Sequence, residues 1–120
     1  RRYAEGQYHP PHTDTYTVDG RNVTLLATML MYLQDTEEGG ATHFPRALPE
    51  PARVYPKRGA LGIWFSCDEA GADDRLSLHE GEPVLKGKKW TATYFVYNNP
   101  GVYCPKPSLK QWLPKDMWVW

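Results

Sequence analysis

Turn-forming residues recur along almost the whole chain, and they leave only short runs between them in which regular structure can form. These runs are rich in β-branched and aromatic residues, and none shows a convincing 3.6-residue period. Strands are therefore expected over His12–Tyr16, Val23–Leu33, Ala41–Phe44, Val54–Pro56, Ala60–Ser66, Leu76–His79 and Lys89–Tyr97. Short strands at this spacing predict an all-β fold of the jelly-roll type, which includes the cupin-like barrel.

The composition indicates an ordinary globular chain and argues against two kinds of partner. The chain has 120 residues, enough for one domain, and 14 basic residues balance 14 acidic ones. Neither sign gathers in a long run, so nothing suggests a nucleic-acid groove or an anionic membrane surface. The longest nearly apolar run, Val23–Leu33, has eleven residues. A membrane span needs about 20, so this run is expected to be a buried strand.

The domain organisation is expected to be simple. Residues 1–97 should form the barrel core, and residues 98–120, rich in proline and aromatic residues, should form a strap packed on the same domain. Candidate site residues occur within the first dozen positions, so supporting N-terminal elements are expected to be missing from this chain. Cys67 and Cys104 permit either one bridge or two free thiols. The sequence does not fix the oligomeric state.

The run His12-Thr13-Asp14 is the first candidate for a metal site. Residues two apart in a strand project from the same face, so an imidazole and a carboxylate would point the same way. A third ligand must come from another strand, and His79 ends such a run. Two histidines and one carboxylate on one side of a metal form the facial triad of non-haem Fe(II) oxygenases. Zinc accepts the same ligands, and a hydrogen-bonded structural histidine is a common alternative.

A lysine follows on the next expected strand. If the strands of His79 and Lys89 both face the barrel interior, Lys89 points inward, where an unpaired ammonium is costly. A dicarboxylic co-substrate could chelate iron at one end and pair with Lys89 at the other. The alternative is that Lys88 and Lys89 are both solvated charges at a strand edge.

Two hydroxyl-bearing residues share one face of the run Val23–Leu33. Thr28 and Tyr32 would place their hydroxyls on a mostly apolar wall, and buried hydroxyls need partners. A bound carboxylate could supply those partners. A backbone carbonyl could equally accept from the tyrosine.

Several motifs, in order and at matching spacing, resemble the catalytic domain of prolyl 4-hydroxylases within the 2-oxoglutarate/Fe(II)-dependent oxygenase superfamily. The matching runs are Tyr3–Gln7 leading to His12–Asp14, Thr28–Leu33, Glu37–Pro45, Pro56–Ala60, Leu76–Val84 and Gly87–Trp90. Together they extend from about Tyr3 to Tyr97. Several independent motifs in register are more specific than the metal-ligand pattern alone.

This resemblance implies a double-stranded β-helix with iron near one mouth of the barrel. The positions that match the family's iron ligands are His12, Asp14 and His79. Lys89 matches the residue that pairs with the distal carboxylate of 2-oxoglutarate. The other positions that match the surroundings of this co-substrate are Tyr32, Thr28 and Tyr3.

The implied activity is that of a dioxygenase similar to procollagen-proline 4-hydroxylase. It would hydroxylate peptidyl proline while 2-oxoglutarate is decarboxylated to succinate, with Fe(II), O2 and ascorbate as reductant. For a eukaryotic source, the resemblance implies the lumen of the endoplasmic reticulum. One alternative is the same chemistry on a free amino acid or small metabolite. A second is a non-catalytic, cupin-like ligand-binding barrel.

A proline-containing peptide would enter as an extended or polyproline II segment, a conformation that suits aromatic grooves. The candidate lining residues are Tyr8, Tyr16, Trp64 and Trp90. Each of these could equally be core or edge packing. The chain departs from the family pattern on this side of the site, with His9 in place of a tyrosine and Phe95 and Tyr97 in place of tryptophan and histidine.

Overall fold

The computed structural model describes residues 1–18, 21–68 and 70–97, with the backbone alone for residues 16–18 and 21–24. The strands are β1 (Arg2–Tyr3), β2 (His9–His12), β3 (Thr15–Val18), β4 (Arg21–Tyr32), β5 (Glu38–Gly39), β6 (Thr42–Phe44), β7 (Ala52–Val54), β8 (Leu61–Phe65), β9 (His79–Gly81), β10 (Val84–Lys86) and β11 (Lys89–Tyr97). One 3₁₀ turn, η1 (Arg75–Ser77), precedes β9. Over these ranges, no helix is long and apolar enough to cross a membrane.

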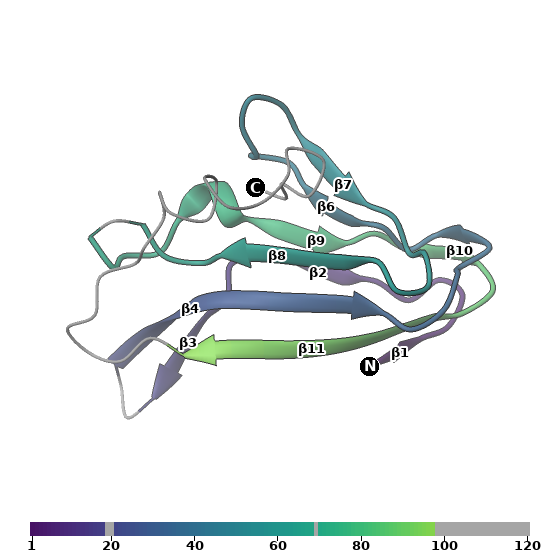
Figure 1. The fold of residues 1–120 in the computed structure, drawn as a ribbon, viewed down its shortest axis with the longest axis horizontal. Coiled ribbons are helices and arrows are strands. Elements are labelled where there is room, and N and C mark those ends of the chain that lie inside the picture. Colours follow the sequence, from purple (N-terminus) through teal and green to yellow (C-terminus); the bar gives the residue numbers. More distant parts are fainter. Residues whose placement is uncertain (19–20, 69, 98–120) are drawn as a thin grey trace.

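The strands form two main sheets, which lie against each other as layers (Figure 1). The larger sheet has the order β1-β11-β4-β3, with β8 also paired to β4. The smaller sheet has the order β2-β9-β6-β7, and β10 pairs with β5 in a separate ribbon. Every pairing is antiparallel. The expected all-β class is therefore confirmed for the described part of the chain.

The expected strand His12–Tyr16 is wrong, because the chain changes sheets within it. β2 ends at His12 and pairs with β9 in the smaller sheet, whereas β3 begins at Thr15 and pairs with β4 in the larger one. Thr13 and Asp14 form the connection between the layers. β2 lies at a sheet edge, where its two prolines do not interrupt a ladder on both sides.

A β-bulge changes which side chains of β4 face inward. Along β11, Val96 pairs with Ala27 and Tyr97 pairs with Leu25, so one residue of β4 is skipped. Strict alternation along the strand would place Leu25 on the face opposite Thr28. Leu25 instead lines the same cavity as Thr28, because the bulge reverses the phase of the strand.

Other boundaries shift for local reasons. The expected strand Leu76–His79 is the 3₁₀ turn η1 followed by β9, because the carboxylate of Asp74 caps the turn by accepting from the backbone N–H of Leu76. The expected strand Val54–Pro56 lies two residues earlier, as β7 (Ala52–Val54). The expected strand Lys89–Tyr97 is confirmed as β11. The expected strap, residues 98–120, lies outside the described residues.

The core lies between the layers. It is built around Phe44, Ala47 and Trp64 with Leu30, Ala52 and Val54 packed against them. The rings of Phe44 and Trp64 meet edge to face with centroids 5.2 Å apart. Gly39 allows the β5–β10 ribbon to close, since a β carbon there would clash with the carbonyl oxygen of Pro83. Phe44 and Trp64 also pack against the ring of His79, with centroids 5.4 and 4.6 Å away, so the core directly adjoins this candidate metal ligand.

Candidate metal and co-substrate site

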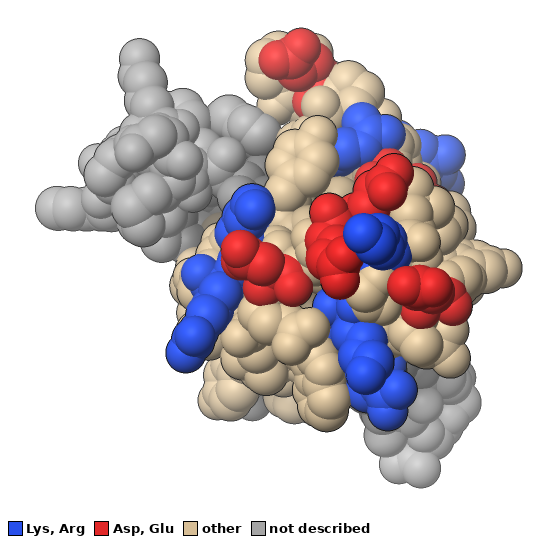
Figure 2. All heavy atoms as spheres, turned by 90° about the vertical axis from the view of Figure 1, so that its right-hand side faces the viewer, with Lys and Arg blue, Asp and Glu red and all other residues tan. Residues whose placement is uncertain are grey.

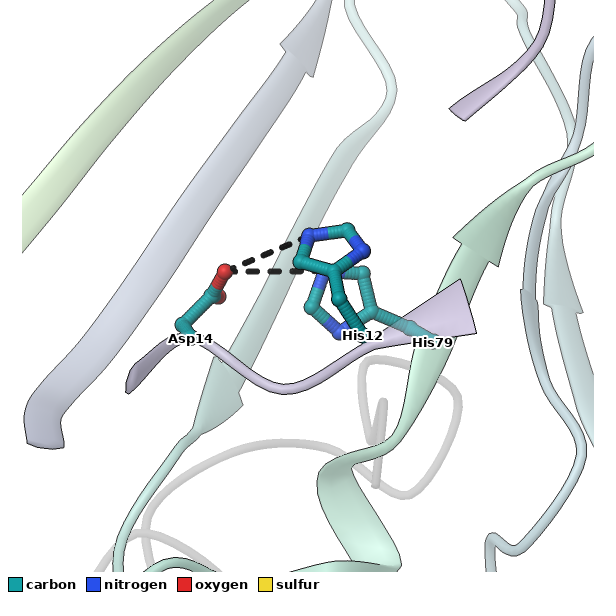
Figure 3. Close-up of side chains that lie close together, drawn as sticks. All are labelled: His12, Asp14 and His79. Atoms are coloured by element: carbon teal, nitrogen blue, oxygen red, sulfur yellow. Dashed lines mark ion pairs between the residues drawn. The ribbon is translucent and has the colours of Figure 1, made fainter. Parts of the chain in front are cut away.

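Three potential metal ligands from separate elements converge at one end of the core (Figure 3). Asp14 Oδ1 lies 3.5 Å from Nε2 of His12 and 3.8 Å from Nε2 of His79. His12 ends β2, His79 begins β9, and these two residues are direct partners across the ladder. Asp14 reaches them from the connection between β2 and β3. The structure therefore brings together the three residues expected from the sequence.

Each imidazole is oriented by its own strand. His12 Nδ1 lies 2.8 Å from the carbonyl oxygen of Pro10, and His79 Nδ1 lies 2.9 Å from that of Ser77. A carbonyl only accepts, so Nδ1 carries the proton in each neutral ring and donates it. Both Nε2 atoms are left as lone-pair donors that face Asp14. This is the tautomer a histidine needs to bind a metal through Nε2.

Asp14 is oriented by the larger sheet. Its Oδ2 accepts hydrogen bonds from Thr28 Oγ1, at 2.6 Å, and from Trp64 Nε1, at 3.0 Å. Oδ1 is thereby left to face the histidines. Trp64 also packs on His79, with ring centroids 4.6 Å apart. Thr28 and Trp64 therefore fix the carboxylate of Asp14 in a direction suited to metal binding.

The electrostatics of the site favour the protonation state that binds a metal at two of the three ligands, Asp14 and His79. Burial acts to raise the pKa of Asp14, but the His12 hydrogen bond, the nearby His79 and the Thr28 hydroxyl together lower it, so Asp14 is ionised. Burial lowers the pKa of His79, with Asp14 opposing, which favours the neutral ring. The hydrogen bond to Asp14 raises the pKa of His12. A metal therefore competes with a proton mainly at His12.

The donor set fits a six-coordinate metal. With ligand bonds of roughly 2.1 Å, adjacent donors around an octahedral ion stand about 3 Å apart. The three donor atoms here all lie within 4.8 Å of one another, so only a small inward movement is required. Two imidazole nitrogens and one carboxylate oxygen suit Fe(II), and the remaining coordination positions stay open for other ligands.

Lys89 lies on the inner face of β11 and is only 4% exposed. Its Nζ stands 5.3 Å from the ring centre of Tyr3 and 5.5 Å from that of Tyr32. Gly81 lies beside it, since a β carbon there would be in ordinary contact with Nζ at 3.5 Å. Burial lowers the pKa of Lys89 to about 8, with the charge of Glu82 opposing. The ammonium is thus poorly compensated, as expected of a group that awaits an anion.

One cavity of about 540 Å³ joins the lysine to the three ligands. Along β11 its wall runs from Lys89 and Thr91 through Thr93 to Phe95 and Tyr97. The cavity is large enough for a small diacid together with part of a second molecule.

Of the other residues expected to contact a co-substrate, Tyr3 and Thr28 line the cavity and Tyr32 does not. The hydroxyl of Thr28, however, donates to Asp14. Tyr32 is fully buried and its hydroxyl lies 2.9 Å from the carbonyl oxygen of Val54 and 2.6 Å from Thr42 Oγ1. Its hydroxyl already has protein partners, which is the alternative that the sequence left open.

The four residues expected to line a substrate groove lie in different places. Tyr8 is 61% exposed and is absent from the cavity wall. Trp90 is 41% exposed and alternates with the inward-facing Lys89 and Thr91, so it lies on the outer face of β11. Trp64 is buried, lines the cavity and donates to Asp14. The side chain of Tyr16 lies outside the described residues.

The sequence placed Phe95 and Tyr97 on the substrate side as departures from the family pattern, but it did not include them among the candidate lining residues. Phe95 and Tyr97 line the cavity and remain 40% and 61% exposed. Their even spacing from Lys89 on one strand was the pattern that could have identified them. His9 also lines the cavity, and its ring meets that of His12 edge-on with centroids 4.4 Å apart.

The surface around the β5–β10 ribbon carries both signs of charge (Figure 2). Lys86 Nζ lies 3.0 Å from Glu37, and Lys57 Nζ lies 3.7 Å from Asp35. On the smaller sheet, His43 lies close to Glu80 and Glu82, and Arg53 donates to Glu82 at 2.8 Å. The charged side chains named here are therefore paired with one another.

Comparison with known proteins places these observations in a family. The family model described as "2OG-Fe(II) oxygenase superfamily" matches residues 1–97. Prolyl 4-hydroxylase 1 of Arabidopsis thaliana is 38% identical over 109 residues, and probable prolyl 4-hydroxylase 8 of the same plant is 41% identical over 116. Each comparison covers 79% of this chain.

The fold is shared with a solved relative. The viral collagen prolyl hydroxylase of Paramecium Bursaria Chlorella virus-1, in its 2OG complex, superposes with a TM-score of 0.68 and 34% identity. The match covers 82% of this chain and 56% of that one, and it confirms the expected double-stranded β-helix. The chain spans 38% and 39% of the length of the two plant relatives.

Proposed function

Because this chain belongs to the 2OG-Fe(II) oxygenase superfamily, we propose that it hydroxylates peptidyl proline and converts 2-oxoglutarate to succinate in the same reaction. The observation that carries the proposal is the cavity that holds His12, Asp14 and His79 together with the buried cation Lys89. Family membership implies Fe(II) and 2-oxoglutarate, and the donor set fits the metal. We further propose O2 as co-substrate and ascorbate as reductant.

The residues would divide the work as follows. His12, Asp14 and His79 would hold Fe(II), which together with 2-oxoglutarate supplies the oxygen chemistry. Lys89 would pair with the distal carboxylate, because a charge-assisted hydrogen bond in a buried site is strong. Thr28 and Trp64 keep the ligand carboxylate turned toward the histidines.

The prolyl substrate is supported by the relatives and by the wall of β11. The relatives are named as prolyl 4-hydroxylases and as a collagen prolyl hydroxylase. Phe95 and Tyr97 supply exposed aromatic faces at the cavity, and such faces suit a polyproline II segment. For a eukaryotic source we propose the lumen of the endoplasmic reticulum.

A peptide assay tests this proposal directly. A proline-rich peptide incubated with the protein, Fe(II), 2-oxoglutarate and ascorbate is expected to gain one oxygen atom on proline, with succinate formed in equal amount. Mass spectrometry of the peptide and quantitation of succinate measure the two products. The matched control peptide carries alanine in place of each proline.

Other outcomes separate the alternatives. Succinate without peptide oxidation, but with oxidation of a free amino acid or small metabolite, would move the proposal to that substrate class. Absence of succinate in every mixture, despite metal binding, would favour a ligand-binding barrel without turnover.

Binding of 2-oxoglutarate is expected to weaken above pH 8. Burial gives Lys89 a pKa of about 8 in the free protein, and only the charged lysine pairs with a carboxylate. Below pH 8 the dissociation constant should therefore change little, and above it the constant should rise by up to about tenfold per pH unit. Calorimetric titration of the metal-loaded protein with 2-oxoglutarate between pH 6.5 and 9.5 measures this dependence.

Lys89→Arg provides the matched control for this pH dependence. Arginine stays charged over the whole range, so its affinity for 2-oxoglutarate should be nearly independent of pH. The same pH dependence in both proteins would show that another group is responsible.

A further inference from the structure

The ligand Asp14 stands on a segment that neither sheet supports by itself. β2 ends at His12 and β3 begins at Thr15, so Asp14 belongs to a connection of two residues between the layers. Its carbonyl oxygen accepts one backbone hydrogen bond, from Leu25 at 3.1 Å. Metal ligands need a fixed backbone as well as a fixed side chain, because small displacements weaken binding.

A carboxylate outside the metal site holds both neighbours of Asp14. Thr13 Oγ1 donates to Oδ2 of Asp73 at 2.9 Å, and Thr15 Oγ1 donates to Oδ1 of the same residue at 3.0 Å. Thr13 directly precedes Asp14 and Thr15 directly follows it. The carboxylate of Asp73 therefore uses both oxygens to bridge the connection that carries the ligand.

Asp73 is itself anchored to the buried end of β8. It forms an isolated antiparallel bridge with Cys67, and the backbone N–H of Asp74 donates to the carbonyl of Ser66 at 2.9 Å. Cys67 and Ser66 are fully buried. β8 also carries Trp64, which bonds to the carboxylate of Asp14. β8 and the two residues after it, Ser66 and Cys67, thus act on Asp14 in two ways. Trp64 holds its carboxylate, and Asp73, anchored to Ser66 and Cys67, holds its backbone through Thr13 and Thr15.

The same short segment leads to a second ligand. Asp74 caps the 3₁₀ turn η1 through the N–H of Leu76, and the last residue of that turn, Ser77, supplies the carbonyl that orients His79. The neighbouring acids Asp73 and Asp74 therefore act on different ligands. Asp73 bridges the connection that holds Asp14, and Asp74 shapes the turn before His79.

We propose that Asp73 is a positioning residue for the metal centre, which holds the β2–β3 connection so that Asp14 Oδ1 faces both histidines. The proposal rests on the proposed function only in requiring that the site binds a metal. The competing explanation is that Asp73 merely stabilises a surface loop, since its contacts are exposed. The two explanations differ in what happens to metal affinity when overall stability is known.

Cobalt(II) binding to the full chain tests the proposal, because bound cobalt has visible absorption that reports on its ligands. Asp73→Ala is expected to weaken cobalt binding by about ten- to a hundredfold and to alter the absorption spectrum. The double variant Thr13→Val/Thr15→Val should reproduce this loss. Adding Asp73→Ala to the double variant should weaken binding little further, because the same contacts are already absent.

Asp35→Ala is the matched control. Asp35 is also an exposed carboxylate that fixes a loop, through the backbone N–H of Arg58 at 2.7 Å, but it is not among the residues that line the cavity. It should lower the melting temperature without changing cobalt affinity or spectrum. Asp73→Asn should restore part of the affinity, since an amide oxygen can still accept from one threonine.

Four outcomes of the cobalt titrations distinguish a positioning role for Asp73 from a merely stabilising one. Wild-type affinity and spectrum in Asp73→Ala would overturn the positioning role, as would unchanged binding in the threonine double variant if Asp73→Ala fails to fold. Failure of the wild-type protein to bind cobalt at all would instead count against the proposed function. Weakened binding in both variants, with the Asp35 control unchanged, supports the role of Asp73.

Discussion

Asp14→Asn is expected to weaken Fe(II) binding at least about a hundredfold and to reduce peptide hydroxylation to background. Asp14 supplies the anionic ligand of the site, and an amide is neutral and binds metals poorly. The fold should survive, because the amide oxygen can still accept from Thr28 and Trp64 in place of Oδ2. The change in unfolding free energy should stay within about 1 kcal/mol.

Equilibrium dialysis with Fe(II) under argon measures the loss of affinity, and denaturant unfolding measures the stability. Asp35→Asn is the control, since it removes the same charge from an exposed loop residue outside the cavity wall. Iron binding by Asp14→Asn as tight as that of the wild-type protein would remove Asp14 from the ligand set.

Lys89→Met is expected to make the protein more stable and its co-substrate binding much weaker. A lysine that is 4% exposed and has a pKa of about 8, instead of the usual 10.5, carries a desolvation cost of about 3 kcal/mol at pH 7. Methionine has similar length and no charge, so unfolding should require about 1–3 kcal/mol more free energy. Affinity for 2-oxoglutarate should fall about a hundredfold or more, because a buried carboxylate loses its partner.

The stability gain should depend on pH in a defined direction. Below pH 8 Lys89 is protonated in the folded and unfolded states, so its full cost is present. As the pH rises from 8 to 10.5, the folded protein loses this proton first and the cost disappears. The stability gap between Lys89→Met and the wild-type protein should therefore narrow over that range.

Urea unfolding at pH 7 and pH 10 checks this expectation. Lys88→Met is the matched control, because Lys88 is the exposed neighbour and its loss should change neither stability nor 2-oxoglutarate affinity appreciably. A gap between the proteins that stays constant with pH would show that the lysine is not buried as a charge.

The residues of the metal site could be identified from the sequence, but the geometry that joins them could not. Residue type and spacing pointed to His12, Asp14 and His79, and the structure brings all three together. The sequence analysis expected His12 and Asp14 to converge because they lie on one strand. That explanation is wrong, because the chain crosses between the sheets after His12. That crossing depends on which strands pair, and pairing is a long-range property that local alternation does not record.

Alternation also fails wherever a strand is irregular. The bulge beside Leu25 reverses the inward face of β4, and only the register with β11 reveals it. Trp64 was expected to line a substrate groove; it does line the cavity, but it also donates to Asp14 from a strand fifty positions further along the chain. Large aromatic residues are ambiguous in this way, because packing and recognition demand the same side chain.

The three ligands differ in how far their orientation depends on the rest of the molecule. Both imidazoles are aimed by a carbonyl two residues earlier in their own segment, so they retain their direction whenever that segment is formed. The carboxylate of Asp14 is instead oriented by Thr28 on β4 and Trp64 on β8, so it keeps its direction only while the larger sheet stays packed against the smaller one. Loosening of the two layers would turn this carboxylate away first and leave the histidine pair intact. Iron release would then be an early indicator of separating sheets, ahead of any loss of strand content.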